Sequence, residues 1–248
     1  MLKKLLNLFG SSDAIARMGK DFSKMLDLSY ETAVRGGQIF FEESPEADQR
    51  IHIFRSDVKI NQLERRIRKQ VITHVTLGSA PGDVPYCLLL MSLVKDAERI
   101  GDYAKNLAQV HYDGGASIPD DENGAEIRDI RRLVEGTFAE ARQVFATSDA
   151  DSATALIMQG REVNKRCDAL IMEVTRSDYA AATTTTIVLG ARYYKRIESH
   201  VLNILSGVVM PLHKLDYYDE RLFHDVSDSG NDSSDSGDDA LGSEGAPR

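Results

Sequence analysis

Apolar residues recur at spacings of three and four along most of this chain, which is the pattern of a helix with one buried face. Between residues 11 and 43 the pattern predicts a long first helix. Ser44-Pro45-Glu46 fits an N-cap followed by proline at the first helical position, so a second helix is predicted to run to about Leu77. The predicted core stripes are Ile15, Met18, Phe22, Met25 or Leu26, Ser29 and Thr32 or Ala33, followed by Ile53, Ile60, Leu63, Ile67, Val71 and His74.

Four further helices follow. The turn-forming residues 78–83 precede a third helix, whose stripe is Leu90, Leu93, Ala97, Ile100, Ala104 and Leu107. After a second turn-rich stretch at 112–119, helices are predicted at about 124–147, 149–177 and 180–215. The β-branched run 183–188 is the strongest strand signal, but it opens an apolar pattern of helical period, which favours a helix. The expected fold class is therefore all-α.

The two halves of the chain resemble each other. Ala97-Glu-Arg-Ile-Gly-Asp-Tyr-Ala-Lys-Asn-Leu107 aligns with Tyr194-Lys-Arg-Ile-Glu-Ser-His-Val-Leu-Asn-Ile204 at an offset of 97 residues. Ile60-Asn61 and Ile67 align with Val163-Asn164 and Leu170 at an offset of 103. A repeat of this length exceeds a solenoid unit and indicates a duplicated bundle of three helices. Six long helices in two pseudo-repeated antiparallel three-helix bundles are predicted, over residues 12–112 and 122–216.

The two ends of the chain differ in composition from its middle. Residues 1–11 form a short leader of leucines and lysines that allows at most a peripheral membrane contact. Residues 217–248 carry nine acidic side chains against two arginines and few apolar ones, so this tail is expected to be largely disordered. With a formal net charge of −9, the chain gives no sign of nucleic-acid binding.

The cysteines and the hydropathy indicate the compartment. Cys87 and Cys167 are far apart and form no CxxC motif, which argues for neither a disulfide framework nor a structural zinc site. The sequence contains no apolar run of spanning length and no signal-peptide cleavage pattern. We therefore expect a cytoplasmic protein.

Candidate chemistry is concentrated on the third helix. Glu98 and Asp102 are four residues apart, so their carboxylates lie on adjacent turns of one face, where they could chelate a cation or simply be solvated. Arg99 and Arg196 recur in both halves and are expected to pair with a carboxylate of a neighbouring helix, such as Glu64 or Asp96. Gly101, between Glu98 and Asp102, indicates close approach of another backbone or of a ligand at that turn, and close packing is the expected cause.

Enzyme motifs are not found. The sequence contains no Gly-x-Ser-x-Gly, P-loop or His-Glu-x-x-His motif, and no catalytic residues are predicted. A di-iron oxidase would need Glu-x-x-His on two helices, and no glutamate here has a histidine three residues later.

Asp96-Ala-Glu-Arg-Ile-Gly-Asp-Tyr-Ala-Lys-Asn-Leu107 resembles the signature helix of the PhoU family, whose pattern is approximately E-R-I-G-D-x-x-x-N-I. The likeness covers about residues 12–215, and the second copy at 195–204 is degenerate. The resemblance implies an all-α, PhoU-like fold of paired helical bundles. It also implies a non-enzymatic negative regulator of phosphate uptake and phosphate-responsive signalling.

The resemblance further implies a metal site. Family members bind multinuclear metal clusters through paired E/D-x-x-x-D motifs, which would here be Glu98 and Asp102 with Asp57 and Asn61. Asn106 and Glu64 are further candidate ligands. Asn61 departs from the pattern because it is neutral. In the second repeat the corresponding positions are Gly160, Asn164, Lys195 and Ser199, so at most one centre is expected, holding iron, manganese, magnesium or zinc.

The partners implied are subunits of a phosphate ABC transporter, a sensor histidine kinase or a sodium-phosphate cotransporter, and the protein is expected to form a homodimer. Two alternatives remain open at this point. One is a metal-binding or metal-sensing bundle without a transporter partner. The other is a structural adaptor that recognises its partner through the acidic tail.

Overall fold

Six long α-helices account for most of the described chain. The computed structural model describes residues 13–41, 47–78 and 80–216; the predicted leader, the Ser44-Pro45 cap and the acidic tail lie outside these ranges. The helices are α2 (Asp13–Phe41), α3 (Ala47–Thr76), α4 (Val84–Tyr112), α5 (Glu122–Thr147), α6 (Ala150–Val174) and α7 (Ala181–Val209), with short 3₁₀ turns η1 (Pro81–Asp83) and η2 (Leu212–Lys214). No strand occurs within these ranges, so the all-α prediction is confirmed.

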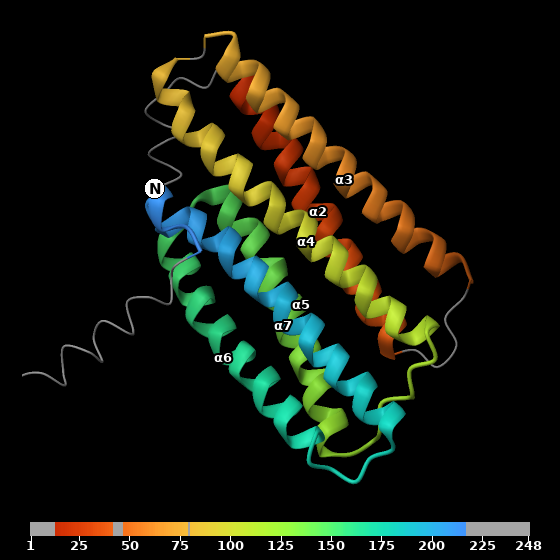
Figure 1. Ribbon diagram of the computed structural model, residues 1–248. Coiled ribbons are helices and arrows are strands. Elements are labelled where there is room, and N and C mark those ends of the chain that lie inside the picture. Colours follow the sequence, from red (N-terminus) through yellow and green to blue (C-terminus); the bar gives the residue numbers. More distant parts are fainter. Residues whose placement is uncertain (1–12, 42–46, 79, 217–248) are drawn as a thin grey trace, which may run out of the picture. The chain divides into compact units, whose positions relative to one another are not determined.

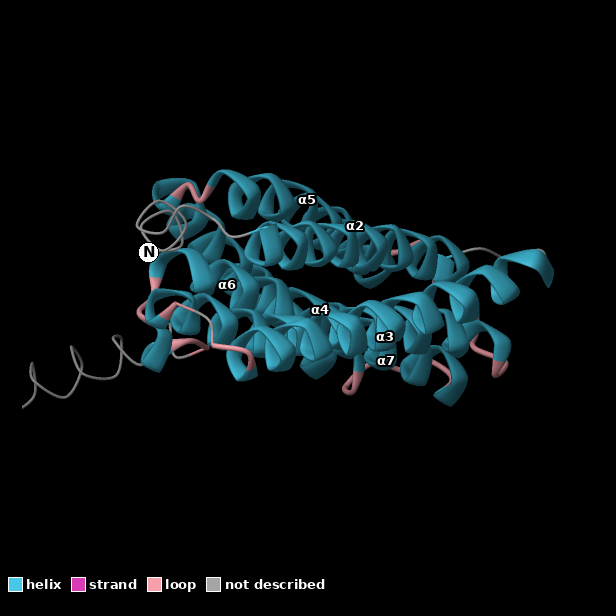
Figure 2. Ribbon diagram, turned by 90° about the horizontal axis from the view of Figure 1, so that it is seen from above, coloured by secondary structure: helices cyan, strands magenta, loops and turns pink. Residues whose placement is uncertain are grey.

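The helices pack as two sets of three (Figure 1). Helices α2, α3 and α4 pack against one another, and α5 and α6 both pack against α7. The two sets meet mainly through α4 and α7, with a smaller contact between α2 and α5. Helices α3 and α6 each pack chiefly against helices of their own set (Figure 1), which leaves a broad outer face on each of them. Figure 2, coloured by secondary structure, shows only helices and loops among the described residues.

The predicted apolar stripes form the core. The stripes of all three helices in the first half are buried as predicted, with one exception. That exception is His74, which lies at the end of α3 and pairs through Nε2 with Oδ2 of Asp83 at 2.8 Å. The aromatic rings of Phe22, Phe138 and Tyr194 are almost completely buried, and burial of such rings is a large part of the hydrophobic stabilisation.

The helix ends follow local chemistry. Asp121 caps α5 by accepting a hydrogen bond from the backbone N–H of Gly124, and Asp149 caps α6 in the same way. The last helix was predicted to reach residue 215, which is wrong: α7 ends at Val209, and Met210 is extended. The cause is Pro211, because a proline ring disfavours helical backbone in the residue before it.

Helices α2 and α4 approach each other closely at Gly36. A β-carbon on this glycine would lie 2.4 Å from the backbone oxygen of Ala104, so only glycine permits this spacing. Gly101 of α4 likewise faces Ile60 of α3, as the prediction of close packing required. None of the described helices is both long and apolar enough to cross a membrane.

Candidate functional site: the acidic face of α3 and α4

The structure brings together two of the predicted ligands, which lie on adjacent helices. Asp57 of α3 and Asp102 of α4 lie on either side of Lys105, whose Nζ is 3.0 Å from Oδ1 of each. The three side chains are between 13 and 27% exposed, so the ion pairs are largely shielded from water. Burial lowers the pKa of Lys105, the two carboxylates raise it, and the net shift is upward. The ammonium group therefore stays charged and joins the two helices.

Glu98 lies one turn before Asp102, on the flank of α4 that faces α3. Burial, the charge of Asp102 and the charge of Glu64 raise the pKa of Glu98, and Arg99 opposes them. Glu64 itself pairs along α3 with Arg68 at 2.8 Å. We refer to Asp57, Glu64, Glu98 and Asp102, with Lys105 between them, as the acidic face.

The predicted role of Arg99 is wrong. Its guanidinium lies 3.7 Å from Glu98 and 3.5 Å from Asp102, both on its own helix, and its side chain is 45% exposed. It pairs with neither Glu64 nor Asp96, because Glu64 is turned towards Arg68 and Asp96 faces α7. Its counterpart Arg196 is also exposed.

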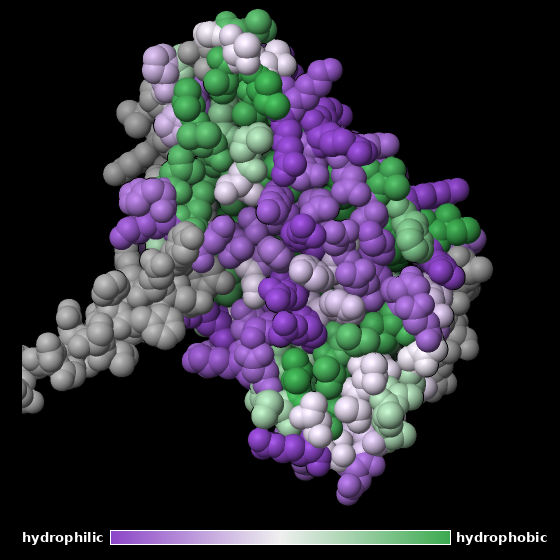
Figure 3. All heavy atoms as spheres, viewed as in Figure 1, coloured by the Kyte–Doolittle hydropathy of each residue, from purple (hydrophilic) through white to green (hydrophobic). Residues whose placement is uncertain are grey.

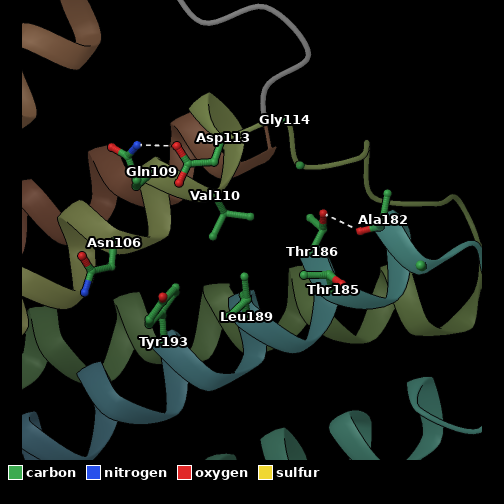
Figure 4. A pocket seen from close by; sticks show the side chains of 12 residues that line it. Asn106, Gln109, Val110, Asp113, Gly114, Ala182, Thr185, Thr186, Leu189 and Tyr193 are labelled. Atoms are coloured by element: carbon green, nitrogen blue, oxygen red, sulfur yellow. Dashed lines mark hydrogen bonds between the residues drawn. The ribbon is translucent and has the colours of Figure 1, made fainter.

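The two asparagines among the candidate ligands, Asn61 and Asn106, do not take part in these ion pairs. Asn61 is half-buried on α3, one turn after Asp57. The side chain of Asn106 instead lines a hollow of about 350 Å³ between α4 and α7, together with Leu189 and Tyr193 (Figure 4). Gly114, where the chain leaves α4, also lines the hollow.

The arrangement of the acidic face does not fit a resident metal. Within the described residues, no group of three or more histidine, cysteine, aspartate or glutamate side chains is placed to hold a metal ion. The position between Asp57 and Asp102 that a bridging cation would take is occupied by the ammonium of Lys105. Metal binding by Glu98, Asp102, Asp57 and Asn61 stays a prediction.

The second half replaces this charged cluster with one neutral contact and one ion pair. Asn164 and Ser199, which correspond to Asn61 and Asp102, are joined by a hydrogen bond of 3.2 Å. Lys195, at the position of Glu98, donates to both carboxylate oxygens of Asp168 on α6 at 2.5–2.6 Å. A lysine of the third helix thus reaches an aspartate of the second helix in both halves.

A polar cluster that the sequence reasoning missed connects the two halves. Asp96 of α4 is only 7% exposed, and its Oδ1 lies 2.8 Å from Nδ1 of His200 and accepts from the amide of Asn203 at 2.9 Å, both on α7. The ring of His200 stacks on Tyr103 with 5.7 Å between centroids. Tyr103 and His200 are equivalent positions of the repeat, 97 residues apart. Equivalent residues can meet where two pseudo-repeated halves pack about a twofold axis, so this offset was the signal for their contact.

Glu198 was also missed. It is completely buried in α7, and no described group forms a hydrogen bond with either of its carboxyl oxygens. Burial raises its pKa to about 8, an effect that the nearby hydroxyl of Thr137 only partly offsets. The carboxyl group occupies the space left by Gly160, where a β-carbon would lie 2.2 Å from Oε1. Glu198 is four residues after Tyr194 and three before Val201, both on the core stripe of α7. Because spacings of three and four place residues on one helix face, the sequence could have indicated that Glu198 is buried.

The outer face of α3 combines cations with apolar side chains. Arg50, Arg55, Lys59, Arg65, Arg66 and Lys69 are exposed, whereas Asp48 is the one exposed acid among the residues of α3 whose exposure is described. Large apolar side chains lie among them: Ile51, Phe54, Val58, Ile72 and Val75 are 42–59% exposed. In Figure 3 the edge of the molecule formed by α3 shows green patches among purple ones. Helix α3 therefore carries apolar side chains both on the face that packs in the core and on its exposed outer face, where they are mixed with cations.

Comparison with known proteins places this fold. Residues 15–110 match the PhoU domain family. Relatives named phosphate-specific transport system accessory protein PhoU homolog are 26% identical in Pseudomonas aeruginosa and 23% identical in Pseudomonas putida, each over 158 residues. These matches cover 62% of this chain and 65% and 62% of the relatives, so the chain spans less than two thirds of their length.

Two solved structures share the architecture. The phosphate transport system regulatory protein PhoU from Streptococcus pneumoniae superposes with a TM-score of 0.66 at 17% identity, over 78% of this chain and 92% of that one. PhoU from Pseudomonas aeruginosa gives 0.61 at 22% identity, over 81% and 94%. The chain thus matches the PhoU domain family over residues 15–110 and shares its helical-bundle fold with these two solved PhoU structures.

Proposed function

We propose that this chain is a non-enzymatic regulator of phosphate uptake and phosphate-responsive signalling, and that it acts by binding a component of a phosphate transport system. The likeness to the PhoU family carries the proposal, because the relatives from both Pseudomonas species are named accessory proteins of such a system. The charged clusters described above support it. They pair among themselves within and between helices, as structural ion pairs do, and leave the outer helical faces for binding.

The outer face of α3 is the contact surface that the charges favour. It presents exposed arginines and lysines around Ile51, Phe54 and Val58, which line a groove of about 560 Å³ together with Arg50 and Arg55. Aromatic and aliphatic side chains bordered by arginines are typical of protein interfaces. The partner surface that complements this face is acidic at its margins and apolar at its centre.

Charge reversal tests this surface. The full-length chain, carrying an affinity tag, is incubated with solubilised membranes that contain the phosphate transporter of the source cells, and bound subunits are identified by mass spectrometry. We expect wild type to retain transporter subunits and Arg65→Glu/Lys69→Glu to lose most of them. The matched control Arg176→Glu/Arg192→Glu reverses two exposed cations of the other half and should bind as wild type does. Equal retention by all three proteins would remove α3 from the interface.

The same experiment separates the other candidates. A sensor histidine kinase or a sodium-phosphate cotransporter among the retained proteins would change the partner but keep the regulatory function. A metal-sensing bundle would retain none of them. An adaptor that binds through residues 217–248 would lose its partner when that segment is deleted, whereas the proposal expects binding to persist. Homodimerisation stays a prediction.

A further inference from the structure

We propose that the ammonium group of Lys105 is the resident cation of the acidic face, so that α3 and α4 are joined without a metal ion, and that removing this one ammonium raises the affinity of the face for a divalent cation. The inference concerns this chain's own residues and does not depend on the identity of the partner.

The position of Lys105 is the first reason. Its Nζ lies 3.0 Å from an oxygen of Asp57 on one helix and 3.0 Å from an oxygen of Asp102 on the other. A divalent ion bridging α3 and α4 through these carboxylates would need the same space. Since Lys105 is fixed to α4, its ammonium is present at a high effective concentration, about millimolar or more for a short tether, whereas a free ion must compete from solution.

The balance of charge is the second reason. The acidic face has four carboxylates: Asp57, Glu64, Glu98 and Asp102. Lys105 contacts two of them, and the arginines that approach the others are Arg68, 2.8 Å from Glu64, and Arg99, 3.7 Å from Glu98. Three protein cations thus nearly balance four carboxylates, and a divalent ion would meet repulsion from the ammonium as well as attraction from the acids. Without Lys105, four carboxylates would face two arginines, which favours cation binding by oxygen ligands.

The second half of the chain is the third reason. Lys195 donates to both carboxylate oxygens of Asp168 and so also links the third helix of its set to the second. Lys105 and Lys195 are not equivalent positions of the repeat, since the residue matching Lys105 is Leu202. A lysine from the third helix therefore supplies the linking charge in each half from a different position.

Metal analysis of four full-length proteins tests the proposal. Wild type, Lys105→Met, the triple variant Lys105→Met/Asp57→Asn/Asp102→Asn and the control Lys95→Met are purified without chelator or affinity metal. Lys95 is an exposed lysine of the same helix. Metal content is measured by plasma mass spectrometry, Mn²⁺ binding by titration calorimetry, and thermal unfolding with and without EDTA.

We expect wild type and Lys95→Met to hold no stoichiometric metal and to unfold at the same temperature with and without EDTA. Lys105→Met should bind Mn²⁺ at least tenfold more tightly than wild type, and the triple variant should lose that binding. If circular dichroism shows that Lys105→Met has lost its helices, Lys105→Gln, which keeps a hydrogen-bonding side chain, takes its place under the same criterion. Stoichiometric metal in wild type that Asp57→Asn/Asp102→Asn removes, or no gain of Mn²⁺ binding when the ammonium is removed, would overturn the proposal.

Discussion

Replacing the buried Glu198 with glutamine should change how the stability of the protein depends on pH. Burial raises the pKa of this carboxyl group to about 8, whereas an unfolded glutamate has a pKa of about 4.3. Between these values the folded protein retains a proton that the unfolded chain releases. Rising pH therefore favours unfolding, in contrast to the common case of a salt-bridged acid.

The magnitude follows from this linkage. Each pH unit in the window changes the free energy of unfolding by about 1.4 kcal/mol, so roughly 3 kcal/mol is lost from this group between pH 5 and pH 8. Glutamine has nearly the shape of the protonated acid and cannot ionise, so Glu198→Gln should lack this loss and be the more stable protein at pH 8. All other titrating groups are common to both proteins and cancel in the difference.

Urea unfolding followed by far-ultraviolet circular dichroism at pH 5, 6, 7 and 8 measures the effect. Glu140→Gln, which changes an exposed glutamate of α5, is the matched control and should keep the wild-type slope. The reasoning is refuted if wild type and Glu198→Gln lose the same free energy between pH 5 and pH 8, because Glu198 would then be ionised in the folded protein across that range.

Two further changes test how the helices are held together. Gly36→Ala places a β-carbon against the backbone of Ala104 and should lower the free energy of unfolding by roughly 1–3 kcal/mol. Gly136→Ala, in open space on α5, is the control and should raise the free energy of unfolding by up to about 1 kcal/mol. Equal effects of the two changes in urea unfolding would contradict the close approach of α2 and α4. Asp96→Ala removes the carboxylate that pairs with His200 across the two halves and should lower the free energy of unfolding by about 1–3 kcal/mol in the same measurement. An unchanged urea midpoint would show that this cluster does not hold α4 to α7.

The fold could be predicted well from the sequence because each helix buries a periodic apolar stripe that its own residues define. The failures lie at the helix ends. His74 continues the stripe of α3 by spacing, but it falls in the last turn, where Asp83 of the following turn is within reach. The predicted end of α7 at residue 215 overlooked Pro211 because the apolar residues continue past it.

The candidate site could be predicted only in part. Spacing along one helix correctly placed Glu98 near Asp102. Lys105, three residues after Asp102, is also within one turn of it, so its contact with Asp102 was detectable. The contact of Lys105 with Asp57 depends on the register between α3 and α4, which is set by side-chain packing such as Ile60 against Gly101. One sequence does not define that register.

Contacts between the halves were beyond reach for a similar reason. Asp96 and His200 are 104 residues apart, and their pairing follows from how α4 packs on α7. The internal repeat predicts that such helices are equivalent, but not which faces they turn towards each other. The match between Tyr103 and His200 at the offset of 97 relates to the stacking of their rings and not to the pairing of Asp96 with His200.

The central claim is that this chain restrains phosphate uptake through a transporter, and phosphate uptake by the source cells tests it most directly. Initial rates of radiolabelled phosphate entry are compared in phosphate-rich medium for cells with the gene, cells without it, and cells without it that express either wild type or Arg65→Glu/Lys69→Glu. We predict faster uptake without the gene, restored to normal by wild type and not by the variant at equal protein level. Uptake that is the same with and without the gene would contradict the account.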